Sequence, residues 1–563
     1  MSGPAGSDES AAPSTPAPGA GRAVAKAAAV IALITIAARV VGFGRNVVFA
    51  NTVGQTCLGE TYQTTNTIPN IVFEVVAGGA LAGVVVPLVA GYLARERKDD
   101  ADRVSSALLS WAVLALTPIA VLIAVLARPI TAAMLGAGAC DGAVDAGASM
   151  LRIFAPQIVL YGVGIVLTGI LQAHRRFAGP ALAPLLSSVV VIAAYLVFAM
   201  VAGRGADLGE VSESEQLILS VGTTLGVVAL SLSLVVPLLG SGVRLRPTLR
   251  FPEESAKRAR RMAGSGIVAL LGQQAAIATA LVLSNQQGVP TGAINVFTYA
   301  QTLFFLPWAI AAVPIATSVF PQLSAATARD DRADYARHLI GAHRAILALS
   351  AIAIAAIIAA AREIALVFVG RSPGVPSVDA LTWGIIGFLI GLVGYSMFAL
   401  HSRALFALHR SGANAVAAAL GWGTVIIASV ALAGVFDKDD RVFALSLANS
   451  IGVLLFGVLL VVFTAPVARR SAVGQVAGVL AATALGVGIG IAVFAVPLPG
   501  WLDAYTNGGI MNALVAGAIR AGVSAVLAAA VLWVVPGSGL RELLRRGRRS
   551  QDENDGSVRG RVE

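Results

Sequence analysis

The sequence predicts an all-α polytopic membrane protein with about 14 transmembrane helices. The chain has 563 residues, of which 57% are hydrophobic and only 12% charged, and its mean hydropathy is +0.82. Soluble proteins carry about a quarter charged residues, so too little polar surface remains here to cover a water-soluble body. The apolar stretches run without interruption for about 18 residues or more instead of alternating, which excludes a transmembrane β-barrel.

Fourteen apolar stretches, separated by polar breaks, are long enough to cross a bilayer. A crossing requires about 20 mostly apolar residues, and several stretches exceed this length, which favours tilted or broken helices. In chain order the predicted spans lie near residues 24–50, 66–93, 104–127, 148–172, 179–202, 216–239, 263–285, 292–323, 341–361, 377–400, 412–435, 442–465, 472–496 and 513–535.

The distribution of basic residues orients these spans. If both termini lie in the cytoplasm, the segments on that side hold 27 Lys and Arg residues and the outer segments hold 6. Lys and Arg accumulate in cytoplasmic loops, so this orientation explains the formal charge of +10 without a nucleic-acid partner. Residues 1–21 are rich in Ser, Pro, Gly and Ala and predict a disordered tail, while residues 541–563 predict a basic cytoplasmic tail.

A pattern of five residues occurs twice in the chain, 234 positions apart, and this internal repeat predicts two lobes. Both copies lie at the cytoplasmic end of the second span of their half. The halves are therefore related by an axis along the membrane normal, as in two-lobed alternating-access carriers. We therefore predict an N-terminal lobe over residues 22–240 (spans 1–6), a C-terminal lobe over 241–466 (spans 7–12) and two further spans over 467–540. The recurring residues, offset by 234, are Val85, Pro87, Ala94, Arg95 and Asp100, which return as Val319, Pro321, Ala328, Arg329 and Asp334.

Charged residues inside the first two spans mark the candidate binding site. A charge at the bilayer centre costs about 2.5–3.5 kcal/mol, so it needs a partner or a watery cavity. The first span carries Arg39 and Arg45, and the intervening Gly42 and Gly44 form a candidate hinge that can turn both toward one cavity. Glu74 in the second span either pairs with one arginine or shares the cavity with both. Two arginines against one carboxylate leave a positive surplus, which favours an anionic ligand.

The other reactive side chains predict neither a metal site nor an enzyme. Cys57 and Cys140 lack the paired spacing of zinc or iron–sulfur ligands. Both fall on the outer side, where a disulfide and two free thiols are equal alternatives. The sequence has no G-x-x-x-x-G-K-[ST] phosphate loop and no catalytic constellation, so we expect no cofactor. Arg520, in the last span, is expected to extend to the membrane interface.

Motifs near the start of the chain resemble a known family. The run Ala38-Arg39-Val40-Val41-Gly42-Phe43-Gly44-Arg45 is followed by Glu60, by Ile68-Pro69-Asn70, by Ala77-Gly78-Gly79-Ala80 and by Val86-Pro87. This series resembles the opening of the MurJ (MviN) lipid II flippases of the MOP exporter superfamily. Their pattern is approximately S-R-x-x-G-x-x-R, an acidic residue, I-P-N, A-E-G-A and V-P. The resemblance includes the two extra C-terminal spans, which the twelve-span drug exporters lack.

The resemblance implies a flippase that exports an undecaprenyl-pyrophosphate-linked peptidoglycan precursor, lipid II, from the inner to the outer leaflet of the bacterial plasma membrane. Arg39 and Arg45 match the two first-span arginines, and Glu60 stands where the family's acidic residue lies. In the family, arginines of a central cavity bind the anionic headgroup. Partners implied are the glycolipid, the bilayer and, as candidates, cell-wall synthesis proteins.

The sequence also departs from the family pattern. Phe73 and Glu74 stand where two arginines are expected after I-P-N, and the eighth-span segment that normally includes an arginine carries Gln301 and Thr302 instead. Half of the expected positive cavity is therefore missing. We expect Glu74, Gln301 and Thr302 to take the place of these residues in the substrate site.

Several other functions remain as alternatives. The cargo of a flippase can be another polyprenyl-linked glycan. A cation-coupled multidrug antiporter of the same superfamily would have twelve spans and cationic ligands. A membrane-embedded glycosyl- or acyltransferase needs buried acid or base groups near a loop, for which the candidates are Glu60 and Glu74 alone. The buried arginines disfavour a purely structural scaffold.

Overall fold

A computed structural model describes residues 20–75, 82–136, 139–250, 267–370, 372, 378–467, 471–497 and 510–534. Nearly all of the predicted N-terminal tail, the whole C-terminal tail and the Ala-Gly-Gly-Ala motif at 77–80 lie outside these residues. The described part is helical and holds no strand.

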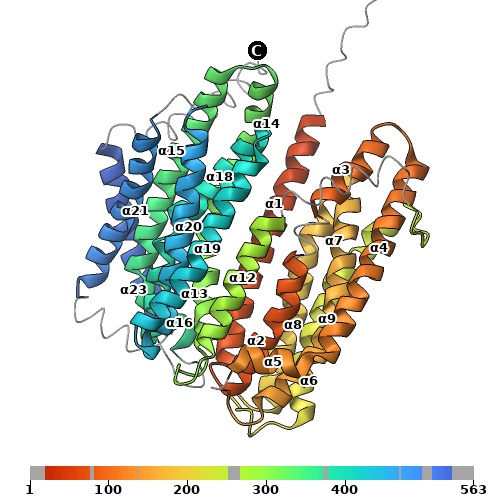
Figure 1. Cartoon of the computed structure of the whole chain (residues 1–563). Coiled ribbons are helices and arrows are strands. Elements are labelled where there is room, and N and C mark those ends of the chain that lie inside the picture. The colour runs from red at the N-terminus through yellow and green to blue at the C-terminus, as the bar shows by residue number, and fades with distance from the viewer. Residues whose placement is uncertain are drawn as a thin grey trace, which may run out of the picture.

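The helices follow one another with short connections (Figure 1). The first half holds α1 (Ala20–Thr52), α2 (Cys57–Phe73), α3 (Ala82–Leu93), α4 (Lys98–Val125), α5 (Ala127–Leu135), α6 (Ala143–Phe154), α7 (Gln157–Ala173), α8 (Ala178–Val201), α9 (Glu213–Leu232) and α10 (Val235–Leu239). The second half holds α12 (Ile267–Ser284), α13 (Ala293–Pro307), a π-helical turn (Trp308–Ala312), α14 (Val313–Ala328), α15 (Arg332–Ala359), α16 (Ala361–Val369), α17 (Val378–Leu389), α18 (Leu392–Ala407), α19 (Ser411–Val435), a 3-10 turn (Lys438–Asp440) and α20 (Arg441–Thr464). The chain continues through α21 (Ala472–Ala495) and α23 (Ile510–Val534).

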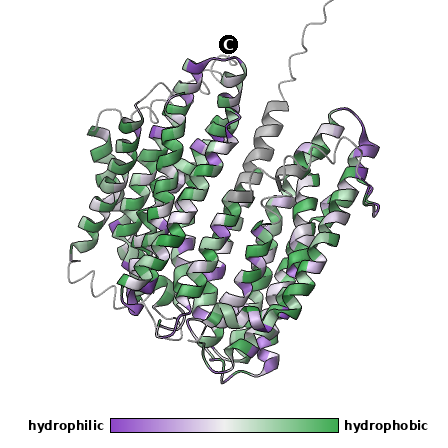
Figure 2. Cartoon of the chain, in the orientation of Figure 1, coloured by the Kyte–Doolittle hydropathy of each residue, from purple (hydrophilic) through white to green (hydrophobic). Residues whose placement is uncertain are grey.

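The predicted class, an all-α polytopic membrane protein, is confirmed. Twelve helices or helix pairs of the described chain are long and apolar enough to cross a membrane. The second and seventh predicted spans are not among them: α2 and α3 flank residues outside the described part, and α12 is shorter. The total of 14 stays a prediction. Figure 2 shows hydrophobic residues along the helices and hydrophilic ones gathered at their ends, as a bilayer requires.

The repeat offset recurs in the backbone. α4 and α15 are both 28 residues long, and their first residues, Lys98 and Arg332, are separated by that offset, as are the first residues of the 9-residue helices α5 and α16. The two turns that precede α4 and α15 hold Glu96 (φ 59°) and Asp330 (φ 53°), again one offset apart. Non-glycine residues rarely adopt this left-handed conformation, so the repeat extends to individual residues of the fold.

The two halves pack as lobes. α1 packs along α8 and α4 along α7 in the first half, while α19 packs along α20 and α12 along α19 in the second. α21 and α23 lie against α15 of the second lobe, and α23 also contacts α16. Figure 1 shows the ribbons of the two lobes meeting at the end where α2, α5 and α16 lie and diverging toward α3 and α14.

Candidate functional site

Hydrogen bonds join the two lobes at the end where α1 terminates. Nδ2 of Asn46 donates to Thr302 Oγ1 at 3.0 Å, and Nδ2 of Asn295 donates to the carbonyl of Gly54 at 3.0 Å. Nε2 of Gln63 lies 3.5 Å from Thr298 Oγ1. Threonine and amide side chains can form such bonds across an otherwise apolar interface, where an unpaired polar group is costly. We call this end the outer seal, because the predicted orientation places it outside.

Two asparagines form a symmetric pair within the outer seal. Nδ2 of Asn51, in α1, donates to the carbonyl of Phe368 in the opposite lobe at 3.2 Å. Nδ2 of Asn285, just after α12, donates to the carbonyl of Met134 at 3.0 Å. The two donors are separated by the repeat offset, and so are the two acceptors, so each lobe holds the other through the same contact. Asn285 also donates to Thr64 Oγ1 at 3.0 Å.

Glu60 belongs to the same seal. Its Oε2 accepts a hydrogen bond from the backbone N–H of Gly292 at 2.6 Å, at the N-terminus of α13 in the other lobe. A carboxylate is favoured there because the N–H groups and dipole of a helix N-terminus are positive. Gly292 has φ +83°, and an added Cβ would approach Gln55 Cβ to 2.7 Å, so only glycine fits.

Replacing Glu60 with glutamine is expected to loosen the outer seal. The side chain keeps its shape but loses the charge that strengthens its bond to Gly292, a loss of about 1 kcal/mol or roughly fivefold in the closed-to-open ratio. The measurement is the rate at which a cysteine introduced at Thr298 reacts with an impermeant maleimide, which should rise severalfold. The matched control, Glu213→Gln at an exposed first-turn position of α9, should leave the rate unchanged; equal rates in both variants would contradict the role of Glu60.

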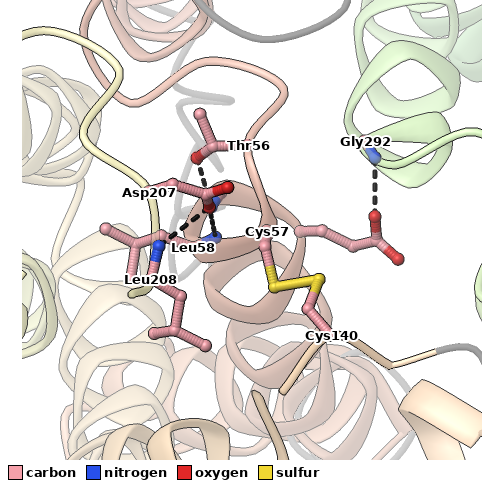
Figure 3. Close-up of a disulfide and its surroundings, with 9 residues drawn as sticks. Thr56, Cys57, Leu58, Cys140, Asp207, Leu208 and Gly292 are labelled. Atoms are coloured by element: carbon pink, nitrogen blue, oxygen red, sulfur yellow. Dashed lines mark hydrogen bonds between the residues drawn. A yellow bond between two sulfur atoms is a disulfide. The ribbon is translucent and has the colours of Figure 1, made fainter. Parts of the chain in front are cut away.

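A disulfide fixes the first lobe beside this contact. Cys57 starts α2 and Cys140 lies between α5 and α6; their sulfurs are 2.10 Å apart and their Cα atoms 6.3 Å apart. Of the two alternatives left by the sequence, the structure therefore has the bonded one. Figure 3 shows the disulfide with Gly292 and its hydrogen bond nearby, and Leu58 N–H donating to Asp207 at 3.4 Å. A structural disulfide requires an oxidising compartment, which agrees with the predicted outer location.

Replacing both cysteines with serine is expected to destabilise the protein by about 2–4 kcal/mol, because the bond closes a loop of 83 residues in the unfolded chain. Thermal unfolding of the detergent-purified protein, with and without a membrane-permeant reductant, measures this. The reductant should lower the midpoint of the wild-type protein to that of the double variant and leave the variant unchanged. A reductant effect of equal size on the variant would show that the bond is not its cause.

Arg45 faces the interior of the first lobe, and Arg39 is exposed on α1. The guanidinium of Arg45 is close enough to the hydroxyls of Tyr62, Tyr161 and Tyr195 for a direct electrostatic interaction. Among the residues that the structure describes, neither arginine has an ion-pair partner. Within the described chain, no carboxylate neutralises either guanidinium.

Glu74 lies between the lobes. It caps α2, is exposed, and acts electrostatically on the hydroxyls of Tyr161 in the first lobe and Tyr395 in the second. The ring of neighbouring Phe73 packs on Tyr161 with centroids 4.4 Å apart. Within the described chain Glu74 forms no ion pair, so it neutralises neither Arg39 nor Arg45.

The remaining predicted site residues lie in separate places. Thr302 accepts from Asn46 and so lies at the lobe interface, whereas Gln301 lines a cavity of about 20 Å³ inside the second lobe, with Gln273 and Asn449. That volume holds about one water molecule. Thus Glu74 and Thr302 lie at the region between the lobes, Glu60 lies at its sealed end, and Arg45 lies beside the tyrosines of the first lobe.

The hinge at Gly42 and Gly44 stays a prediction, since α1 runs as one helix through both. An added Cβ at Gly42 would make only an ordinary contact with Ser188, and at Gly44 no contact. Packing therefore does not account for either glycine. Among the described residues, no group of three or more His, Cys, Asp or Glu side chains could hold a metal ion.

Sequence reasoning missed the asparagine pair and a buried tyrosine cluster. The hydroxyl of Tyr62 lies 2.8 Å from that of Tyr195 and 2.6 Å from Thr223 Oγ1, which joins α2, α8 and α9 beside Arg45. A signal for the asparagines was available, because Asn51 and Asn285 obey the repeat offset. No comparable signal exists for the tyrosines, whose partners lie on helices far apart in the sequence.

Comparisons with known proteins agree on one family. A family model described as "Lipid II flippase MurJ" matches residues 49–517, a region that begins shortly after Arg45. The lipid II flippase MurJ of Burkholderia cenocepacia is 25% identical over 309 residues, which is 54% of this chain and 57% of that protein. The alignment thus spans little more than half the length of that relative.

Solved structures show the same fold. A structure titled "Lipid II flippase MurJ, inward closed conformation" superposes with a TM-score of 0.66 at 17% identity, covering 88% of this chain and 98% of that one. An inward-facing multidrug resistance MATE transporter of the MOP superfamily gives a TM-score of 0.63 at 16% identity, covering 79% of this chain and 95% of that one.

Proposed function

Because the chain belongs to the MurJ family of lipid II flippases, we propose that it moves lipid II, an undecaprenyl-pyrophosphate-linked peptidoglycan precursor, from the inner to the outer leaflet by alternating access. It is a multi-pass protein of the bacterial inner membrane. We further propose that both termini are cytoplasmic, so that the outer seal faces away from the cytoplasm. The lobes of this mechanism are the predicted units 22–240 and 241–466, with 467–540 as an accessory pair of spans.

The observation that carries the proposal is the combination of a sealed end with an unpaired arginine. The hydrogen bonds from Asn51 and Asn285, described above, tie the lobes at the outer end. Arg45 precedes Asn51 in α1, on the side away from that end, and has no ion-pair partner in the described chain. A guanidinium fork binds phosphate oxygens through two parallel hydrogen bonds. A diphosphate headgroup entering from the unsealed end would therefore find a positive site before the seal.

We propose that Arg39, Arg45, Glu74 and Thr302 contact the headgroup, with Gln301 behind them in the second lobe. Arg39, exposed about midway along α1, lies farther from the seal than Arg45 and would meet the headgroup first. Thr302 and Asn46 would exchange their mutual hydrogen bond for contacts with sugar hydroxyls. Glu60 contributes to transport indirectly, by stabilising the outer seal. Its carboxylate holds the N-terminus of α13 and does not face the headgroup.

The membrane potential can drive this export. With the interior negative, moving an anion outward is favourable by about 2.3 kcal/mol per charge per 100 mV. If Arg39 and Arg45 travel with the diphosphate, the complex is closer to neutral and the voltage acts on the empty return step instead. No other energy source is required from this chain.

A second candidate is an antiporter of cationic drugs, because the MATE transporters share the fold. Arg39 and Arg45 disfavour it, since neither has an ion-pair partner among the described residues and a cation entering the same space would be repelled. A flippase for another polyprenyl-linked glycan would use the same diphosphate contacts and differ only in the sugars.

Native mass spectrometry of the purified protein tests these alternatives. Lipid II, undecaprenyl phosphate and an unrelated anionic phospholipid compete for the protein at equal concentrations. The proposal expects lipid II to be retained in preference to both. Equal retention of all three lipids would contradict a headgroup site, and preferential binding of a cationic drug would support the antiporter.

A further inference from the structure

The connection between the lobes begins with an extended segment that runs along α4. We call residues 243–250 the strap. Backbone N–H groups of alternate strap residues donate to side chains on one face of α4: Arg244 to Asp102 Oδ2 at 3.1 Å, Arg246 to Ser106 Oγ at 3.0 Å and Thr248 to Ser110 Oγ at 3.2 Å.

These three hydrogen bonds form a ladder between the strap and α4, and its regular spacing has a geometric cause. Four residues of an α-helix rise about 6 Å, and two residues of an extended chain span about 6.6 Å. Acceptors at 102, 106 and 110 therefore stay in step with every second strap residue. The ladder supplies partners for backbone groups that would otherwise be left unsatisfied at the edge of the bilayer.

Alternation along the strap separates apolar from basic side chains. Val243 and Leu245 pack against the hydrophobic core of the first lobe, whereas Arg244, Arg246 and Arg250 are exposed. None of these three guanidinium groups has an ion-pair partner among the described residues. Figure 2 shows hydrophilic residues gathered at this end of α4.

The side chains beside the strap are of the kind found at a membrane interface. Nε1 of Trp111 in α4 donates to the carbonyl of Leu249 at 3.0 Å, and both side chains are about half exposed. Tryptophan is typical of the headgroup level. Exposed Val113 and Leu114 follow at once on α4, where its lipid-facing surface begins.

We propose that the strap is a binding surface for anionic phospholipid headgroups, formed by Arg244, Arg246 and Arg250 above Trp111 and Leu249. The ladder to α4 holds the three arginines along the edge of the bilayer. The first lobe therefore binds the lipid headgroups at a fixed depth relative to the membrane. This surface is distinct from the substrate site and does not depend on what the protein transports.

The test compares retention of phosphatidylglycerol and phosphatidylcholine by the purified full-length protein, measured by native mass spectrometry. The wild-type protein should retain phosphatidylglycerol preferentially. Each arginine replaced by glutamine in the Arg244→Gln/Arg246→Gln/Arg250→Gln variant should weaken this binding about fivefold. The control triple Arg329→Gln/Arg332→Gln/Arg337→Gln removes equal charge from the equivalent end of the second lobe, where aspartates pair with all three, and should have little effect.

A second variant tests whether the placement of the strap arginines matters in addition to their charge. Ser106→Ala/Ser110→Ala removes two steps of the ladder and no charge, and should reduce the preference for phosphatidylglycerol severalfold. Ser105→Ala is the matched control, because the Ser105 hydroxyl donates to the carbonyl of Ala101 in its own helix. The proposal is overturned if the two arginine triples lose binding equally, if the serine double variant behaves like its control, or if inorganic phosphate displaces the lipid and reveals a free-anion site.

Discussion

Replacing Arg45 with alanine is expected to reduce the proposed export to a level that no longer supports growth while leaving the protein folded in the membrane, and Arg39→Ala is expected to do the same. Each guanidinium is expected to contribute about 1.5–3 kcal/mol through charged hydrogen bonds to the diphosphate, so each loss reduces transport about 10- to 150-fold. Neither side chain has an ion-pair partner in the described chain, so its removal leaves no buried carboxylate behind.

Growth of a flippase-depleted cell that carries each variant measures this effect, with the amount of protein in the membrane determined in parallel. Arg128→Ala is the matched control, because Arg128 is exposed and pairs at 2.8 Å with Asp145 of its own lobe. The Arg45→Lys variant should keep part of the activity, since lysine keeps the positive charge but lacks the planar guanidinium that binds two phosphate oxygens at once. Full growth with both alanine variants would leave the proposed headgroup site without support.

Replacing Arg520 with alanine is expected to destabilise the protein by about 3–5 kcal/mol, because a buried carboxylate loses its partner. Nε of Arg520 lies 3.1 Å from Glu363 Oε1, and the two side chains are only 11% and 6% exposed. The Arg520 guanidinium also donates to carbonyls at the end of α21, Val493 at 3.0 Å, Phe494 at 2.7 Å and Val496 at 3.1 Å. This one side chain therefore ties α16, α21 and α23 together.

The midpoint of thermal unfolding in detergent measures the loss. The double variant Arg520→Leu/Glu363→Leu is the decisive control, since removing both charges leaves neither unpaired and should recover most of the stability. If the single and double variants unfold at the same temperature, the ion pair does not hold these helices. The expectation that Arg520 extends to the membrane interface was wrong, because Glu363 and the end of α21 provide a nearer set of acceptors.

The positions of individual site residues show how far sequence reasoning reaches. The arginines of the first span were found because a charge in an apolar stretch is conspicuous in any sequence. Glu60 was found too, but its partner was not. Gly292 is 232 residues away and contributes a backbone N–H group, which every residue except proline has and which therefore leaves no mark in the sequence. The pairing of Cys57 with Cys140 was open for the same reason, since only the packing of α2 on α6 brings the two together.

The sequence by itself determined the membrane class, the two lobes and the constant offset that relates them. These properties are local or periodic: hydropathy adds up along a single stretch, and a duplicated chain repeats its helix boundaries at α4 and α15. Only the tertiary structure decided which end of the lobes is sealed, which thiols and charges are paired, and that a strap runs along α4. An apolar helix can turn any face toward a neighbour at similar free energy in lipid, so partners far apart in sequence become known only when the helices are packed.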